Sequence, residues 1–137
     1  MLDLGRNVTL ERLELHIELA SLPRANGWIY RTLRSITSSA FNEFVIWVQS
    51  GGYEQELADP NGWKTVESSL GALAEHNPDF RVVFKADPPS FLYGNLHIYD
   101  RARSFFESYL SVVLSKGFAK FEYVPRVDNP CRKLRLL

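Results

Sequence analysis

The decisive stretch of sequence is LERLELHIEL, residues 10–19. Apolar and polar residues alternate from Leu13 to Leu19, which is the period of a β-strand buried on one face. Short runs with the same character return three times, as FNEFVIWV (41–48), FRVVF (80–84) and FAKFEY (118–123). Segments with helix or turn signals separate these runs. Strand–helix units of this kind cannot bury their apolar faces alone, so we expect them to stack side by side.

The segments between the runs predict three helices. The clearest helix follows Gly62 and has apolar residues at spacings of three and four, namely Trp63, Val66, Leu70 and Leu73. Asn61 is placed to cap its start and Asn77-Pro78 to end it. A second helix is predicted over about 101–115, with a buried side marked by Phe105, Tyr109, Val112 and Val113 and a stop at Lys116-Gly117. A turn or short helix is predicted over 28–39.

The order of these elements predicts the fold class. We expect strands near 11–19, 42–49, 80–86 and 119–124. Because a helix-length connection separates each pair, the strands should be parallel with right-handed crossovers. The chain, residues 1–137, is therefore predicted to be a single α/β domain, either a small open sheet or a degenerate solenoid fragment, with helices mainly on one side. Matching inward positions should be buried together: Leu15, Ile46, Val82 and Phe121.

Composition excludes several function classes. Sixteen basic and sixteen acidic residues cancel, whereas nucleic-acid binding needs a basic excess. No window approaches the roughly 20 apolar residues of a membrane-spanning helix. Cys131 is the only cysteine, which excludes an internal disulfide and fits a reducing compartment. Since the opening MLDLGRNVTL lacks the apolar run of a signal peptide, we expect a cytoplasmic or nuclear protein.

No catalytic or cofactor motif is present in the sequence. The histidines, His16, His76 and His97, are not in the paired spacings typical of metal sites. There is no nucleophile elbow and no glycine-rich phosphate loop. We therefore expect no cofactor, no metal and no enzymatic activity. A small hydrolase is the third alternative, and it would require a pocket with converging polar groups.

The outward residues of the predicted strands form a candidate recognition surface. Aligning the four runs gives three rows across the sheet: His16, Trp47 and Val83; Glu14, Val45, Arg81 and Glu122; and Glu18, Gln49 and Lys85. If helices cover one face only, these rows are exposed around Trp47, and tryptophan is favoured at interfaces. Parallel sheets are usually covered on both faces, so the alternative is that Trp47 belongs to the core.

Strand edges and charge suggest self-association. Acidic residues prevail over 53–79 and basic residues from 101 onward, and opposed patches can orient a second copy. An uncapped stack of units also exposes its terminal strand edges. We therefore expect a homodimer, formed through a terminal strand or the apolar sheet face. The alternative is a monomer in which the first ten residues and the tail from Pro125 act as caps.

A family resemblance narrows the function. Leu10-x-x-Leu13-x-Leu15 is the core of a leucine-rich repeat. Three further stretches resemble the leucine-rich-repeat-like C-terminal region of the F-box-type proteins of mushroom-forming fungi: TLRSITSSAFNEFVIWV (32–48), GWKTVESSLGAL (62–73) and FRVVFKADPP (80–89). The likeness covers about residues 10–125. It implies that the repeat region recognises another protein, and it brings no catalytic residues.

Two function classes follow. The leading expectation is a non-enzymatic protein-interaction module that resembles the substrate-recognition part of F-box proteins. The alternative is a small fungal carbohydrate-binding or immunomodulatory protein that acts outside the cell. Exposed Trp and Tyr in the loops 50–62 and 87–100 would favour the alternative, because aromatic faces stack on sugar rings. A glycan array would discriminate between the two.

Overall fold

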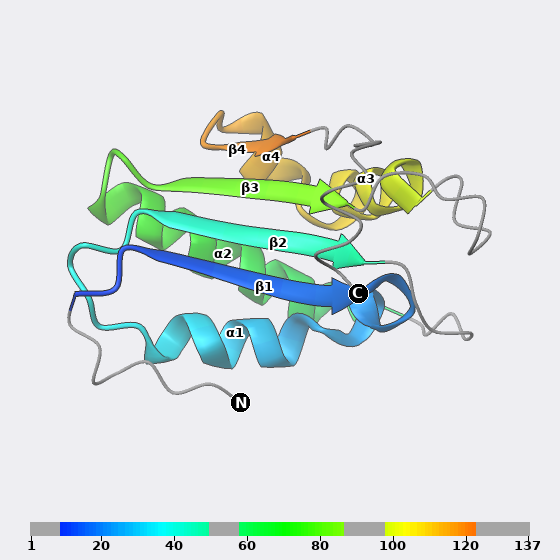
Figure 1. Ribbon diagram of the computed structural model, residues 1–137, viewed down its shortest axis with the longest axis horizontal. Helices are drawn as coiled ribbons and strands as arrows, with labels where there is room; N and C mark the ends of the chain where they lie inside the picture. The colour runs from blue at the N-terminus through cyan, green and yellow to red at the C-terminus, as the bar shows by residue number, and fades with distance from the viewer. Residues whose placement is uncertain (1–8, 50–57, 87–97, 123–137) are drawn as a thin grey trace, which may run out of the picture.

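Strands and helices alternate along the chain (Figure 1). The computed structural model describes residues 9–49, 58–86 and 98–122. In chain order the elements are β1 (Arg12–Glu18), the 3-10 helix η1 (Leu19–Arg24), α1 (Asn26–Ser35), β2 (Glu43–Gln49), α2 (Pro60–His76), β3 (Arg81–Ala86), α3 (Ile98–Tyr109), α4 (Ser111–Ser115) and β4 (Ala119–Phe121).

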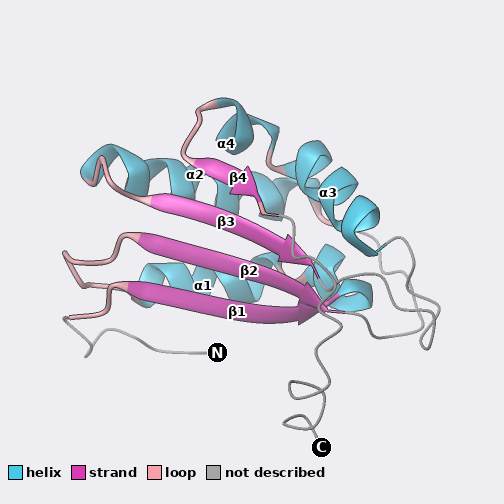
Figure 2. Cartoon of the chain, turned by 45° about the horizontal axis from the view of Figure 1, so that its top comes forward, coloured by secondary structure: helices cyan, strands magenta, loops and turns pink. Residues whose placement is uncertain are grey.

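The four strands form one parallel sheet in the order β1-β2-β3-β4. The predicted fold class is therefore confirmed. The described helices lie on one side of the sheet, which leaves its other face toward the viewer in Figure 1 and uncovered by helices in Figure 2. Each of β1, β2 and β3 is thus followed by a crossover through the same helical layer, as expected of stacked strand–helix units.

The core fills the space between the sheet and the helices. Its largest fully buried side chains include Trp63, Phe44, Phe80, Phe84 and Phe106. Phe84 of β3 stacks on Phe106 of α3, with ring centroids 4.2 Å apart. The indole Nε1 of Trp63 donates a hydrogen bond of 3.0 Å to the Pro23 carbonyl, so the one polar atom of this buried ring is satisfied.

The first two helices differ from the prediction at their starts. α1 begins at Asn26 and ends at Ser35, rather than spanning 28–39. α2 is capped by Asp59, not by Asn61, because the Asp59 carboxylate accepts a hydrogen bond of 3.1 Å from the Asn61 amide. Pro60 occupies the first helical position, where its fixed φ suits the helix and its missing N–H is not needed. The helix ends before its C-cap residue, Asn77, as predicted.

The expected single helix over 101–115 is wrong. The chain breaks at Leu110, whose φ of −125° and ψ of 35° are not helical, and α4 begins after it. The Glu67 carboxylate of α2 accepts hydrogen bonds from the Val112 and Val113 amides, at 2.9 and 3.2 Å. The break changes the helical phase, so Val113 is buried while Val112 is 48% exposed. Gly117 follows the end of α4 with a φ of +86°, which supports the predicted stop there.

The register of β3 also corrects the prediction. Leu15 is level with Ile46, as expected, but Ile46 is level with Phe84 rather than Val82. Val82 instead pairs with Phe44 and Ala119. A shift of two residues leaves every side chain on its predicted face, so the inward set still packs together. The exception is Phe121, which is only partly buried because β4 is a short edge strand.

Candidate interaction surface

The face of the sheet away from the helices is the candidate site, and we call it the open sheet face. Its rows run Arg12, Glu43, Arg81; then Glu14, Val45, Val83, Lys120; then His16, Trp47, Lys85; then Glu18, Gln49. The predicted rows are correct for β1 and β2. They are wrong for Arg81, Val83 and Lys85, each of which lies one row away from the expected place, and for Glu122, because Lys120 occupies the row of Glu14 and Val45. Glu122 follows β4 directly, and its carboxylate reaches the Lys85 ammonium.

The valines of this face are buried, although the prediction made them part of an exposed surface. Val45 is 0% and Val83 is 6% exposed. They are neighbours in one row at the middle of the sheet. Short side chains in this position lie below the longer residues of the two flanking rows, which include Glu43, Trp47 and Lys85. Both valines therefore add to the core rather than to the surface that a partner could touch.

Trp47 stands at the centre of the open sheet face and is held from both sides. The His16 ring of β1 stacks on it, with centroids 5.6 Å apart and planes inclined by 11°. On the β3 side the Lys85 ammonium lies 5.3 Å from the ring centroid, in cation–π geometry. Trp47 is half-buried, so the expectation that it belongs fully to the core is not met. The two neighbours lie against its ring, one from each adjacent strand.

Hydrogen bonds fix the orientation of His16. Its Nδ1 lies 3.0 Å from the Gln49 amide nitrogen and its Nε2 lies 2.6 Å from a Glu14 carboxylate oxygen. The amide can only donate and the carboxylate can only accept, so Nε2 carries the ring proton and donates it to Glu14. The stacking partner of Trp47 is therefore held in one tautomer and one rotamer, and the row is preorganised.

Ion pairs border the His16–Trp47–Lys85 row. Arg12 contacts the carboxylates of Glu14 and Glu43, at 2.8 and 3.1 Å. Partial burial raises the pKa of Glu14, but the hydrogen bonds from His16 and Arg12 outweigh it, so the net pKa lies below its usual range. On the other side Lys85 reaches Glu122 at 3.4 Å. Acidic and basic groups thus alternate across the surface, and no single sign of charge dominates it.

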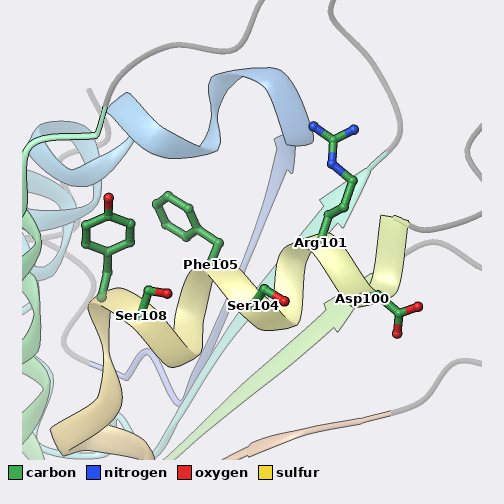
Figure 3. Close-up of a pocket in the computed structure, with 6 residues that line it drawn as sticks. Asp100, Arg101, Ser104, Phe105 and Ser108 are labelled. Atoms are coloured by element: carbon green, nitrogen blue, oxygen red, sulfur yellow. The ribbon is translucent and has the colours of Figure 1, made fainter.

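The hollow along α3 offers no catalytic arrangement. A hollow of about 430 Å³ runs along α3 and is lined by Asp100, Arg101, Ser104, Phe105, Ser108 and Tyr109. In Figure 3 Arg101 and Phe105 project from one side of the helix and Asp100 from another. Asp100 and Ser108 lie about 12 Å apart along the helix axis, so these polar groups do not converge on one atom.

Other predicted features lie outside the described residues or have no counterpart in them. His97, Cys131 and most of the loops expected to bear sugar-stacking aromatics belong to 50–57, 87–97 and 123–137, which are not described. Among the described residues no group of three or more His, Cys, Asp or Glu could hold a metal ion. Within the same residues no helix is both long and apolar enough to cross a membrane.

The sequence predicts the face on which most of these residues lie but not the contacts between them. Glu14, His16, Glu18, Trp47, Gln49 and Lys85 were each assigned to the outward face, where the structure places them. The contact between Lys85 and Trp47 was missed, because the expected rows paired Trp47 with Val83. Comparison with known proteins adds no further residue, since no protein-family model, no curated protein and no solved structure matches this chain.

Proposed function

We propose that this chain is a non-enzymatic protein-interaction module that binds another protein through the open sheet face. The observation that carries the proposal is the His16–Trp47–Lys85 row, which stands on a face that none of the described helices covers. Tryptophan is enriched among the residues that dominate binding energy at protein interfaces. The resemblance to the recognition region of F-box-type proteins supports the same kind of partner.

The rigidity of the row favours binding. A side chain that is already held in one rotamer loses little conformational entropy when a partner arrives. His16 is held by Glu14 and Gln49, and Trp47 is held by His16 and Lys85. The alternating charges around the row would fix the orientation of the partner and reject surfaces of the wrong charge pattern.

The mixed charge of this face favours a protein over a nucleic acid. A phosphate backbone requires a basic surface. On the open sheet face the basic Arg12, Lys85 and Lys120 are each within 4.0 Å of a carboxylate of Glu14, Glu43 or Glu122. The proposed partner is therefore a protein with an apolar centre and charges of both signs, met in the cytoplasm or the nucleus.

The geometry of Trp47 also favours a protein over a sugar. Carbohydrate recognition by an aromatic residue uses the face of the ring. His16 and Lys85 lie against the two faces of Trp47, one from each neighbouring strand. A sugar ring would first have to displace His16 or Lys85 before it could stack on the indole of Trp47.

Site-specific photo-crosslinking tests the proposal. A photoreactive amino acid is placed at Gln49, on the open sheet face, and in a matched variant at Val112, which is exposed on α4 in the helical layer. Both variants are incubated with lysate of the source organism. We expect one recurrent protein adduct at Gln49 and none at Val112. Equal adducts at both positions, or a glycan-array signal without any protein adduct, would contradict the proposal.

A further inference from the structure

The outer edge of β1 presents backbone groups that no other described strand pairs with. β1 is a terminal strand, since the order of the sheet is β1-β2-β3-β4. The Glu11 carbonyl points toward β2, where it accepts hydrogen bonds from the Asn42 and Glu43 amides. In a parallel ladder alternate residues direct their N–H and C=O groups to the same side. The outer edge is therefore formed by the N–H and C=O groups of Arg12, Glu14, His16 and Glu18.

The side chains of these four residues complement one another when β1 is paired with a second copy of itself in the antiparallel direction. Along β1 they read basic, acidic, histidine, acidic, and all four side chains lie on the open sheet face. An antiparallel copy of β1 centred on Leu15 places Arg12 opposite Glu18 of the second copy. The same register places Glu14 opposite His16 of the second copy. Each pair occurs twice, because the arrangement is two-fold symmetric.

Neighbouring registers lack this complementarity. If the two antiparallel β1 strands are centred on Glu14, the Glu14 carboxylate of one copy lies opposite that of the other. Centring it on His16 places Glu14 opposite Glu18 of the second copy, which is also a like-charge pair and is destabilising. Only the register centred on Leu15 pairs all seven residues of β1. The charge pattern thus selects the register with the longest overlap.

In the same register, an apolar side chain of each copy faces a hollow in the other copy. Leu13 of the second copy comes to lie opposite Ile17, on the side of the sheet that bears the helices. There a hollow of about 390 Å³ is lined in part by Ile17, Ala25 and Trp28. Leu13 is only partly buried within one chain. Pairing in this register would direct Leu13 of each copy toward the hollow of the other and bury both further.

We propose that the edge of β1 binds a second copy of this chain, antiparallel and centred on Leu15. The two sheets then join into one, with main-chain hydrogen bonds across the axis between Arg12 and Glu18 and between Glu14 and His16. Directly opposite residues of an antiparallel pair share a face, so both His16–Trp47–Lys85 rows lie on the same side. Such a dimer would present the open sheet face twice to a bivalent partner.

Charge exchange tests the register. The mass of the full chain is followed by analytical ultracentrifugation from about 1 to 100 µM, the usual range for self-association. We expect the wild type to reach twice 15.7 kDa. Glu14→Lys should weaken the dimer at least about tenfold, because a cation then replaces the carboxylate that faces His16 of the second copy and contacts Arg12. Adding His16→Glu should restore it. The matched control is Glu75→Lys, the same charge reversal on the exposed side of α2, which should leave the mass of the dimer unchanged.

A backbone substitution separates pairing from folding. Glu14→Pro removes an N–H that points away from β2, so it should keep the circular dichroism of the folded chain and yield a monomer. A wild type that stays at 15.7 kDa throughout the range overturns the proposal. A dimer that survives both Glu14→Lys and Glu14→Pro also overturns it, since that dimer must use another surface. Binding of a foreign strand at this edge without any dimer would overturn it as well.

Discussion

At the scale of single residues, Thr32 is an exception in an otherwise apolar core. This side chain of α1 is 0% exposed, and its hydroxyl has no hydrogen-bond partner among the described residues. Leaving a buried polar group unsatisfied costs about 1–3 kcal/mol. Valine has nearly the same shape without the hydroxyl. We therefore expect Thr32→Val to raise the free energy of unfolding by about 1 kcal/mol in a urea titration.

Ser38, whose hydroxyl is hydrogen-bonded, provides the control for Thr32. The Ser38 hydroxyl donates a hydrogen bond of 2.8 Å to the Leu10 carbonyl and accepts one of 3.2 Å from the Ala40 amide. Ser38→Ala should therefore lower the free energy of unfolding by about 1 kcal/mol. A Thr32→Val variant that is destabilised as much as Ser38→Ala would show that the threonine hydroxyl is satisfied in the folded chain.

Glu14 makes the stability depend on pH. Its pKa in the folded chain lies below the ordinary value of 4.5. A carboxylate with a depressed pKa adds stability above the unfolded value and loses it as the pH falls through the folded value. The wild type should therefore exceed Glu14→Gln in free energy of unfolding at neutral pH, and the difference should shrink below pH 4.5.

Urea titrations at a series of pH values, run on both chains, measure the effect of Glu14. The salt dependence provides the control, because the side chain is 26% exposed and its pairing with Arg12 is partly screened by salt. A stability difference between wild type and Glu14→Gln that stays constant from neutral to acid pH would contradict the assigned hydrogen bonds.

At the scale of elements, α4 depends on a side chain from a distant part of the chain. The Glu67 carboxylate of α2 receives the amides of Val112 and Val113 at the start of α4. Removing a side chain that caps a helix start costs about 0.5–2 kcal/mol. We expect Glu67→Ala to lower the free energy of unfolding by about 1–2 kcal/mol. Glu75→Ala, on the exposed side of α2, should change it by less than about 0.5 kcal/mol.

Hydrogen exchange provides a local measurement of the same contact. In wild type the Val112 and Val113 amides are expected to be protected, although they lie in the first turn of α4, where no helical carbonyl is available to them. Glu67→Ala should remove that protection and leave the amides of α2 unchanged. Equal protection in both chains would mean that the carboxylate does not cap α4.

Sequence patterns could predict the strands but not every alignment between them. The alternation around Leu15 and Ile46 fixes which side chains point inward, and the helix-length connections fix the parallel direction. Alternation has a period of two, so it cannot distinguish Val82 from Phe84 as the partner of Ile46. For the same reason, the alternation does not predict that Lys85 lies beside Trp47.

The break between α3 and α4 could not be read from local sequence either. Phe105, Tyr109 and Val113 follow a helical period without interruption, so the pattern predicts one helix. The amides freed at the break are bound by Glu67, which lies 45 residues from Val112 in the chain. Contacts of this kind override local propensity, and a single sequence carries no signal for them.

At the scale of the whole molecule, the two faces of the sheet separate the packed core from the proposed recognition surface. One face of the parallel sheet is packed against all the described helices, and it holds nearly all the large buried side chains. The other face carries the ordered row of His16, Trp47 and Lys85 with its ion pairs. Substitutions on the open sheet face should therefore change binding more than they change folding.

The most direct test of this account measures the affinity of the crosslinked partner for Trp47→Ala. Truncating the central aromatic residue of an interface typically costs 2 kcal/mol or more, so we predict that Kd rises by at least about thirtyfold. Val112→Ala, which removes exposed apolar surface from the helical layer, should leave Kd unchanged. Both variants should keep the circular dichroism of the wild type. A folded Trp47→Ala chain that binds the partner as tightly as wild type would contradict the claim that the open sheet face is the recognition surface.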